Sequence, residues 1–367
     1  MIRIGKFTDF YCDVTKMGTK IPQERYLSKG QFPIIDQGRQ TIAGRWDDED
    51  GIFSDVPAIV FGDHTRAIKY IEEPFFIGAD GVKILRPKNT QDSPKYLFYA
   101  LQAARIPDLG YSRHFKAVKE LDIRVCSKEE QAEIVRILES IDFLIEKRHE
   151  EVRYLDQAVK SRFIELFGDQ TANPYAWQQT SIGACCTLKS GTSLPADKEN
   201  EGGAIPYVKV GDMNYPGNEQ YITTSSRFVS EQTAGTGVFP VGTVVFPKRG
   251  GAIGTNKKRL TRLPICADLN VMGVTAGRRL TPQYLMAYFN TVDLGTLNNG
   301  SSVPQINNKD IAPLLICIPP MALQEQFAAF VEQTDKSKYY SSLSFRYCQA
   351  AANTYRQEWM TCRTSDF

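Results

Sequence analysis

The chain contains the stretch Gly110-Tyr-Ser-Arg-His-Phe-Lys-Ala-Val-Lys-Glu-Leu121, which aligns without a gap on Gly300-Ser-Ser-Val-Pro-Gln-Ile-Asn-Asn-Lys-Asp-Ile311. Each stretch leads into an apolar, strand-like segment and then a helical one. Weaker matches precede it in the same order, namely Val60-Phe61 with Val245-Phe246, Tyr96-Leu97 with Tyr284-Leu285, and Ile4-Gly5 with Ile182-Gly183. A period near half of the 367-residue chain is too long for a solenoid. We therefore predict two copies of one globular domain, each followed by its own helix.

A second feature is the segment from Glu129 to about Phe167, which contains no proline or glycine. Ser127 and Glu130 have the spacing of a capping box, and Gly168 is typical of a helix end. About 39 residues at about 1.5 Å each would extend roughly 58 Å, so this helix is predicted to act as a spacer. Apolar residues recur at alternating spacings of three and four, the pattern of a helix that packs along another helix: Ile134, Leu138, Ile141, Ile145, Val152, Leu155, Val159, Phe163 and Leu166.

The second copy repeats the start of this helix. Gln131 and Asp142 are eleven residues apart, as are Gln324 and Asp335. Two helices of one repeat can pair with each other, which predicts an antiparallel coiled coil with one globular domain at each end. After Lys338 the apolar seam fades among serines, so the sequence predicts the distal helix to about this residue and leaves its end open.

The fold class follows from the pattern within each half. Short β-rich runs are separated by Gly, Pro, Asp and Asn, and one helix is predicted in each half, from Pro94 to Ala104 and from Pro282 to Asn290. This pattern predicts α+β domains rather than an alternating parallel sheet. The predicted boundaries are residues 1–126 for the first globular domain, 127–168 for the central helix, 169–319 for the second domain and 320–367 for the distal helix with a polar tail.

The bulk composition is that of an ordinary globular protein, with 42% hydrophobic and 23% charged residues. The N-terminus has no apolar core of signal-peptide length, and no run of 18 apolar residues follows, so a cytoplasmic location is expected. Eight cysteines without a Cys-x-x-Cys pair, and only three histidines, argue against a zinc site. A net charge of +2 is modest, so a DNA-binding surface would have to be local or shared with a partner.

No catalytic constellation is evident in the sequence. Gly250-Gly-Ala-Ile-Gly254 is not followed by the Lys-Ser/Thr of a phosphate-binding loop. Asn173-Pro174-Tyr175 lacks the second proline of a methyltransferase loop. The carboxylates of Asp47-Asp-Glu-Asp50 have no lysine at nuclease-like spacing. We therefore expect no catalytic residue and no metal in this chain.

Binding features are stronger, and they lie in two pairs of loops. Cations, amides and glycines in one loop let side chains and backbone amides approach phosphates, and polar side chains can bond base edges. The alternatives are solvated hairpin tips for the first pair of loops and turn or capping bonds for the second. The first pair gives His64 and Arg66 in one half, and Lys248, Arg249, Asn256, Lys257, Lys258 and Arg259 in the other. The second pair gives Arg113, His114 and Lys116 in one half, and Ser302, Gln305, Asn307 and Asn308 in the other.

Several motifs occur together along the chain: Phe61-Gly-Asp-His-Thr-Arg66, Phe76-Ile-Gly-Ala-Asp-Gly81, Tyr111-Ser-Arg-His-Phe-Lys116, Glu130-Gln131, Phe167-Gly-Asp169, Asn173-Pro174, Trp177 and Pro319-Pro320. In this combination the chain resembles the specificity subunit of type I restriction-modification systems over residues 1 to about 338. The resemblance implies two target recognition domains, each recognising half of a split DNA sequence, with helices that set the unread spacer. It also implies two modification subunits docked on the helices, which bind S-adenosylmethionine, and restriction subunits that join them. The polar C-terminal tail departs from the family.

Two other classes of function remain open from the sequence. The first is an enzyme, a nuclease or methyltransferase with unrecognised motifs, which would cut or methylate DNA unaided. The second is a two-headed adaptor that holds proteins together. The adaptor would account for the repeat and the paired helices but would leave the basic and amide-rich loops without a role.

Overall fold

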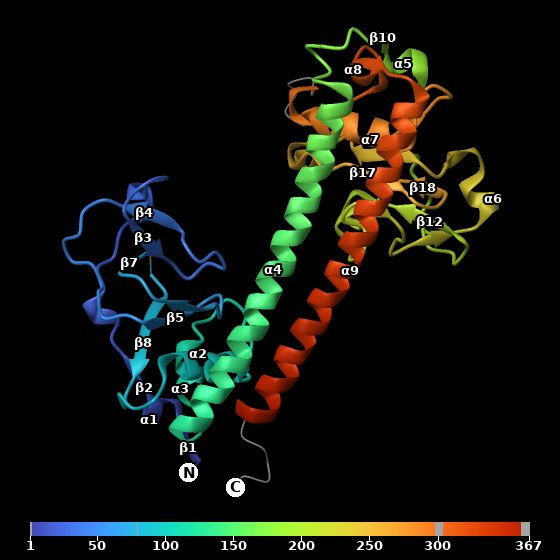
Figure 1. Ribbon diagram of the computed structural model, residues 1–367. Coiled ribbons are helices and arrows are strands. Elements are labelled where there is room, and N and C mark those ends of the chain that lie inside the picture. The colour runs from blue at the N-terminus through green and yellow to red at the C-terminus, as the bar shows by residue number, and fades with distance from the viewer. Residues whose placement is uncertain (1, 79, 298–303, 361–367) are drawn as a thin grey trace. The chain divides into compact units, whose positions relative to one another are not determined.

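The computed structural model describes residues 2–78, 80–297 and 304–360, and the chain divides into two compact units (Figure 1). Unit 1 comprises Met1–Glu150 with Ser341–Phe367, and unit 2 comprises Glu151–Tyr340. The long helices α4 (Lys128–Phe167) and α9 (Met321–Met360) each contribute one part to each unit. Both units combine short, mostly antiparallel strands with helices, which confirms the predicted α+β class. No helix in the described part of the chain is long and apolar enough to span a membrane.

Unit 1 is built around a four-stranded sheet of order β2-β8-β5-β6, with a smaller sheet of order β4-β3-β7 and a β1-β9 pair. The first elements are β1 (Arg3–Lys6), α1 (Phe7–Phe10), β2 (Tyr11–Asp13), β3 (Phe32–Ile35), β4 (Gly44–Trp46) and β5 (Ala58–Gly62). They are followed by β6 (Ile68–Ile71), β7 (Phe76–Ile77), β8 (Val82–Pro87), α2 (Pro94–Ala103), α3 (Phe115–Lys119) and β9 (Asp122–Val125).

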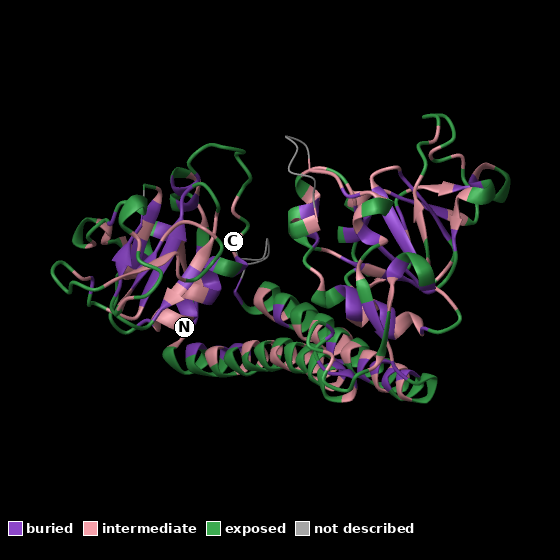
Figure 2. Ribbon diagram, turned by 90° about the horizontal axis from the view of Figure 1, so that it is seen from above, coloured by how far each residue is buried: buried purple, intermediate pink, exposed green. Residues whose placement is uncertain are grey.

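Strand β5 explains why the central strands are continuously apolar. Successive side chains of a strand point to opposite faces. Ile59 and Phe61 pack in the cluster that contains α2, and Ala58 and Val60 pack in the cluster that contains Ile35 of the smaller sheet. Both faces of β5 are therefore buried, as Figure 2 shows for the sheets of each unit.

Unit 2 repeats this architecture with a sheet of order β11-β19-β16-β17-β13, a smaller sheet of order β14-β12-β18-β15 and a β10-β20 pair. Its first elements are β10 (Gln178–Ser181), α5 (Ile182–Cys185), β11 (Cys186–Ser190), β12 (Ile205–Val208), the 3-10 turn η3 (Val210–Asn214), β13 (Tyr221–Ile222), β14 (Phe228–Val229) and α6 (Glu231–Ala234). They are followed by β15 (Val238–Phe239), β16 (Thr243–Pro247), the 3-10 turn η5 (Gly251–Thr255), β17 (Arg259–Thr261), β18 (Ile265–Ala267), β19 (Val271–Ala276), α7 (Pro282–Thr291), α8 (Asn308–Ile311) and β20 (Leu315–Ile318).

The two copies share the order of their common strands, which confirms the repeat. β2-β8-β5-β6 corresponds to β11-β19-β16-β17, and β4-β3-β7 corresponds to β14-β12-β18, while unit 2 adds β13 and β15 at the sheet edges. Each smaller sheet contains one parallel pair, and each unit also has a separate antiparallel pair of strands. The predicted equivalence of Phe61 and Phe246 in the two copies is confirmed. The next residues, Gly62 and Pro247, are the last of their strands and pair with Val82 and Val271, the first residues of the neighbouring strands.

The residue register of the repeat differs from the sequence alignment at two places. The amide of Phe7 bonds the carbonyl of Leu121, and the amide of Ile182 bonds that of Leu314. Leu121 therefore corresponds to Leu314 rather than Ile311, and Ile182 corresponds to Phe7 rather than Ile4. The ungapped alignment was wrong by three residues here because apolar residues recur about one helical turn apart, so a shift of three again places apolar residues on apolar residues.

Helices α2 and α7 begin as the sequence predicts, and each is held to a long helix in the same way. Ser93 caps α2 and Thr281 caps α7, each with proline in the first turn. The capping residue's own amide then donates to a buried glutamine of the long helix, Ser93 to Gln131 at 2.8 Å and Thr281 to Gln324 at 2.9 Å. The glutamine amide nitrogens bond the carbonyl oxygens of Cys126 and Pro319. Each glutamine therefore makes the same contacts in its own copy of the repeat, which explains why the sequence has one at the start of both long helices.

Helix α4 has the ends that the sequence predicts. Ser127 and Glu130 form a reciprocal capping box, with the Ser127 amide 3.0 Å from Glu130 Oε2 and the Glu130 amide 3.3 Å from Ser127 Oγ. At the other end Gly168 adopts a φ of 73° and its amide bonds the Ile164 carbonyl. A left-handed glycine directly after the last turn is a common helix end.

Helix α9 reaches Met360, so it continues past Lys338, beyond which the sequence left its end open. In unit 1 its last part packs antiparallel to the first part of α4, with Arg356 bonding Asp142 at 3.2 Å and the Phe345 ring 4.4 Å from that of His149. In unit 2 its first part packs antiparallel to the rest of α4. The seam after Lys338 includes the small side chains of Ser341, Cys348 and Ala352, which a search for large apolar residues misses, together with Phe345 and Met360.

Candidate nucleic-acid interface

Three loops of unit 1 meet on one surface, which we call the unit 1 loop surface: residues 36–40, 62–67 and 106–114. The His64 amide donates to Gln37 Oε1 at 3.3 Å, and Thr65 Oγ1 donates to the Gln37 carbonyl. His64 Nδ1 lies 3.3 Å from the Tyr111 carbonyl oxygen, and Arg66 bonds Asp108 at 2.7 Å. The contacts bring exposed polar side chains from three separate parts of the sequence together.

His114 belongs to the interior of this surface. Its side chain is 1% exposed, Nε2 accepts the Leu109 amide at 3.1 Å, and Nδ1 lies 2.8 Å from the Asp63 carbonyl oxygen. A neutral ring with its proton on Nδ1 satisfies both bonds. The structure therefore corrects the expectation that His114 faces DNA, because burial gives it the role of joining two loops.

The other predicted residues of unit 1 remain accessible to different degrees. His64, Arg113 and Lys116 are exposed. Arg66 is half-buried, and its charge is balanced by Asp108. His64, Arg113 and Lys116 are the better candidates for contact with an anionic ligand, because a cation paired with a carboxylate offers little net charge.

Three loops of unit 2 meet in the equivalent way and form the unit 2 loop surface: residues 209–220, 248–259 and 304–309. The Gly250 amide donates to the Pro304 carbonyl at 2.8 Å, and Arg249 Nη2 lies 3.5 Å from Gln305 Oε1. Lys257 donates to the side-chain oxygen of Asn214 in the first of these loops. The sequence analysis identified the second and third loops, and the structure adds the first.

Several predicted residues of this surface hold its backbone instead of facing outward. Lys258 is 5% exposed, its ammonium bonds Asn256 Oδ1 at 2.7 Å and the Val292 carbonyl at 2.6 Å, and burial lowers its pKa to about 8. Asn256 Oδ1 also accepts the Leu294 amide. Arg259 donates to three backbone carbonyls. The expectation that all of these side chains face a ligand is therefore corrected, since their polar groups bond the protein.

Two cations and three amides remain on the outer side. Arg249 is exposed and Lys257 is half-exposed. Both donate to side-chain amide oxygens, which are uncharged and therefore do not neutralise the two cations. Gln305 donates to Asn307 Oδ1 at 2.9 Å, and Asn308 is exposed. Lys248 is half-buried against Ser190 Oγ at 2.9 Å. Ser302 lies outside the described residues.

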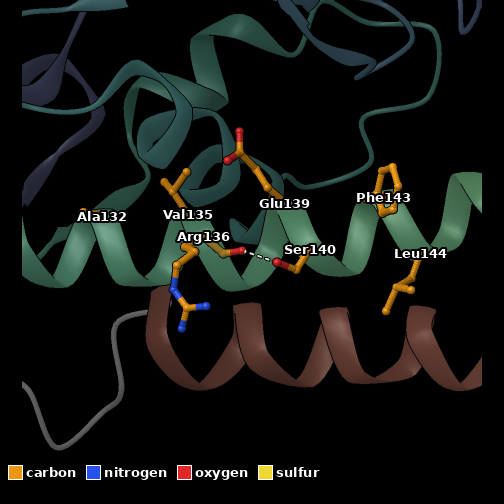
Figure 3. A pocket seen from close by; sticks show the side chains of 7 residues that line it. All are labelled: Ala132, Val135, Arg136, Glu139, Ser140, Phe143 and Leu144. Atoms are coloured by element: carbon orange, nitrogen blue, oxygen red, sulfur yellow. Dashed lines mark hydrogen bonds between the residues drawn. The ribbon is translucent and has the colours of Figure 1, made fainter.

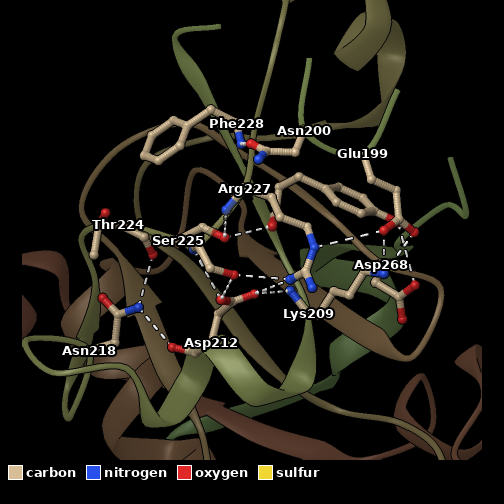
Figure 4. Close-up of polar contacts among 12 residues, drawn as sticks. Glu199, Asn200, Lys209, Asp212, Asn218, Thr224, Ser225, Arg227, Phe228 and Asp268 are labelled. Atoms are coloured by element: carbon tan, nitrogen blue, oxygen red, sulfur yellow. Dashed lines mark hydrogen bonds and ion pairs between the residues drawn. The ribbon is translucent and has the colours of Figure 1, made fainter. Parts of the chain in front are cut away.

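The first loop of each surface was missed by sequence reasoning. In unit 1 it carries Gln37, Arg39 and Gln40 directly after β3, and a run of amides and a cation after an apolar strand was the available signal. In unit 2 the cation of this loop, Lys209, is paired with a carboxylate from outside the loop (Figure 4). Lys209 Nζ lies 2.6 Å from Glu199 Oε2, and the nearby Arg227 also lies within 4 Å of Glu199. These ion pairs hold the start of the loop and make both cations weak candidates for phosphate contact.

A separate apolar surface lies along α4 in unit 1 (Figure 3). Phe143 and Leu144 are 57% and 46% exposed, although they lie on a helix whose other face is packed. Exposed apolar side chains gathered in a groove are typical of a protein-docking site. The groove is lined by Ala132, Val135, Arg136, Glu139, Ser140, Phe143 and Leu144.

The family model described as the type I restriction modification DNA specificity domain matches this chain twice, over residues 7–154 and 174–339. The chain belongs to this family. It is a specificity subunit of a type I restriction-modification system, and its two units contain the two target recognition domains. The two matches fall on the two copies of the repeat, so the duplication seen in the fold is a duplication of the DNA specificity domain.

Two relatives from Methanocaldococcus jannaschii are named as specificity subunits of type I restriction enzymes. The provisionally assigned MjaX specificity subunit is 22% identical over 91% of this chain and 79% of its own length. The MjaIX specificity subunit is 22% identical over 66% of this chain, which spans 60% of that protein. The fold also matches the crystal structure of a type I S subunit from M. genitalium, with a TM-score of 0.60, 15% identity, and coverage of 99% of this chain and 97% of that one.

Proposed function

We propose that each loop surface recognises one half of a split DNA target, and that the chain itself performs no catalysis. The observation that carries this proposal is the presence of the same three-loop surface on both copies of one fold, with different polar side chains. Unit 1 offers Gln37, His64 and Arg113, whereas unit 2 offers Arg249 and Gln305. Because bases are distinguished by the donors and acceptors at their edges, different side chains imply different half-sites.

The energy required is within reach of such small surfaces. A well-placed bidentate contact to a base contributes about 1–3 kcal/mol of discrimination, so a few contacts in each unit suffice. Phosphate contacts supply most of the sequence-independent affinity of a DNA-binding protein. With a net charge of +2, this chain would share those contacts with its partners.

We further propose that the long helices dock two modification subunits, one at each unit, and that these subunits bind S-adenosylmethionine and carry out methylation. Restriction subunits would then join the complex. The α4 groove around Phe143 and Leu144 is the proposed contact in unit 1. The first part of α9 is its counterpart in unit 2, since Gln324 corresponds to Gln131.

The decisive experiment is co-expression with the modification subunit encoded beside this chain, followed by mapping of methylated adenines across the host genome. The expected result is a split motif with a fixed gap. Methylation by this chain alone would instead support an enzyme. A stable complex that leaves the genome unmethylated would favour the protein adaptor, and the absence of a complex would contradict the assembly role.

The charge distribution of the unit 2 loop surface predicts which cations contact phosphates. In the assembled complex, the double substitution Arg249→Gln and Lys257→Gln is expected to weaken binding to a duplex carrying the mapped motif. It should also reduce the slope of log affinity against log salt by up to about 1.8, because each phosphate contact contributes about 0.9. A salt titration of both proteins measures this change.

Lys258→Met is the matched control for this titration. Lys258 is the neighbour of Lys257 in sequence, but it is buried and bonds Asn256 and Val292. Its removal is expected to affect stability and to leave the salt slope unchanged. If the Lys258 variant reduces the slope of log affinity against log salt and the double variant does not, then Lys258 contacts phosphate and Arg249 and Lys257 do not.

A further inference from the structure

Three glycines of unit 2 have no structural reason to be glycine. Gly211, Gly251 and Gly254 have ordinary φ values, and a Cβ added at any of them would have no heavy atom beyond its own local backbone within 4 Å. Glycine in a regular turn lowers stability relative to alanine, because it loses more backbone entropy on folding. An alanine at each position would fit this fold.

Glycines elsewhere in the described residues have an internal reason. Gly191 lies against the carbonyl of Asp268, where a Cβ would collide. Gly242 adopts a φ of 82°, which side-chain-bearing residues rarely adopt. Among the glycines that the structure describes, Gly211, Gly251 and Gly254 are the ones that have neither a positive φ nor a neighbour within 4 Å.

All three lie on the unit 2 loop surface. Gly211 is in η3, and Gly251 and Gly254 are in η5. The bond from Lys257, two residues after η5, to Asn214 of η3 connects the two loops that carry these turns. All three glycines are exposed, and Arg249 and Lys257 flank the pair in η5 on either side along the chain.

Flexibility does not explain the glycines of η5, because this turn is firmly held. Ile253, between Gly251 and Gly254, is 1% exposed and packs in the main core of unit 2. After the turn, the side chain of Asn256 accepts bonds from Lys258 and from the Leu294 amide. The backbone of η5 is therefore presented in one conformation with its glycines facing outward.

We propose that Gly211, Gly251 and Gly254 form a close-approach patch, at which the protein backbone packs against the sugar-phosphate chain of the DNA. Carbon atoms in van der Waals contact lie about 3.5–4.0 Å apart, so a methyl group at the patch would displace the duplex from the flanking cations. Missing side chains let a backbone approach a ligand closely. This inference rests on the proposed function and adds a steric requirement to it.

The test uses the full chain in complex with its modification subunit and the duplex carrying the mapped motif. The variants are Gly211→Ala, Gly251→Ala, Gly254→Ala and Gly254→Leu. Each alanine is expected to leave the unfolding temperature equal or higher and to weaken binding about tenfold, as overpacking of a close contact does. The leucine should weaken binding further. Assembly with the modification subunit should be unchanged.

Ala184→Leu is the control for Gly254→Leu, since it places the same side chain at an exposed position of unit 2 outside the loop surface. It is expected to bind as the unaltered chain does. Wild-type affinity in all four glycine variants would overturn the patch while leaving the proposed function intact. Loss of assembly at unchanged intrinsic DNA affinity would also overturn it, since the surface would then face the modification subunit. If the unaltered complex fails to bind the duplex, both proposals fall.

Discussion

Replacement of Phe167 by alanine is expected to lower the free energy of unfolding of unit 2 by about 3–5 kcal/mol, the usual range for a large aromatic residue in a core. Phe167 is fully buried at the end of α4. Its ring lies 4.7 Å from that of Tyr284 in α7 and 5.5 Å from that of Phe327 in α9. One side chain thus joins both long helices to the recognition domain, and its loss leaves a cavity at that junction.

Ile164→Ala is the matched control, because Ile164 lies on the same helical turn and is 48% exposed. Its removal should change the free energy by less than about 1 kcal/mol. Urea denaturation of the full chain, followed by circular dichroism, would compare the two midpoints. Equal shifts in both variants would show that the aromatic cluster does not hold α4 to unit 2.

Much of the fold could be predicted from the sequence because local signals mark where its helices begin and end. These signals are the capping box at Ser127, the glycine after Phe167, and the prolines that open α2 and α7. Gln131 and Gln324 stood at equivalent places because they make equivalent bonds in both copies. Features that depend on short-range chemistry and occur in both copies can therefore be recognised in the sequence.

The sequence was less informative where tertiary contacts override local pattern. The end of α9 stayed open because its last part packs partly through Ser341 and Ala352, whose small side chains give no strong hydrophobic signal. The repeat alignment slipped by one turn because apolar spacing is ambiguous by three residues. No property of the sequence distinguishes an inward from an outward basic side chain in adjacent positions, so Lys257 and Lys258 looked alike.

The candidate interface shows the same division. Composition placed two of the three loops in each unit, since cations, amides and glycines are concentrated there. The remaining loop is the first one of each surface, and it carries Gln37 in unit 1 and Asn214 in unit 2. It joins the other two loops through hydrogen bonds between distant parts of the chain. Such contacts become visible only once the strands that carry the loops are paired.

The long helices lead to the second prediction of large effect, a change in the gap between half-sites. Four residues of helix add about 6 Å of length and about 40° of rotation beyond a full turn. One base pair of DNA adds about 3.4 Å and about 35°. A four-residue insertion in both helices is therefore expected to lengthen the unread gap by one to two base pairs and to leave both half-sites unchanged.

The contacts between the helices define where to insert. In unit 1 His149 packs on Phe345, and in unit 2 Asp156 pairs with Lys338 at 2.6 Å. Insertion after Glu150 in α4 and after Leu343 in α9 falls between these two contacts on both helices and preserves each of them. A four-residue addition is a stutter, which paired helices absorb by local unwinding.

Methylation mapping of the co-expressed complex would measure the result. A four-residue insertion after Gly202 is the control, because this glycine is exposed and lies in a loop of unit 2, outside both long helices. The control should keep the original gap. A constant gap in the helix variant would show that α4 and α9 do not set the spacing, and altered half-sites would show that the helices also shape the loop surfaces. A longer gap with the same half-sites would show that the loop surfaces recognise the bases and that α4 and α9 set the distance between the half-sites.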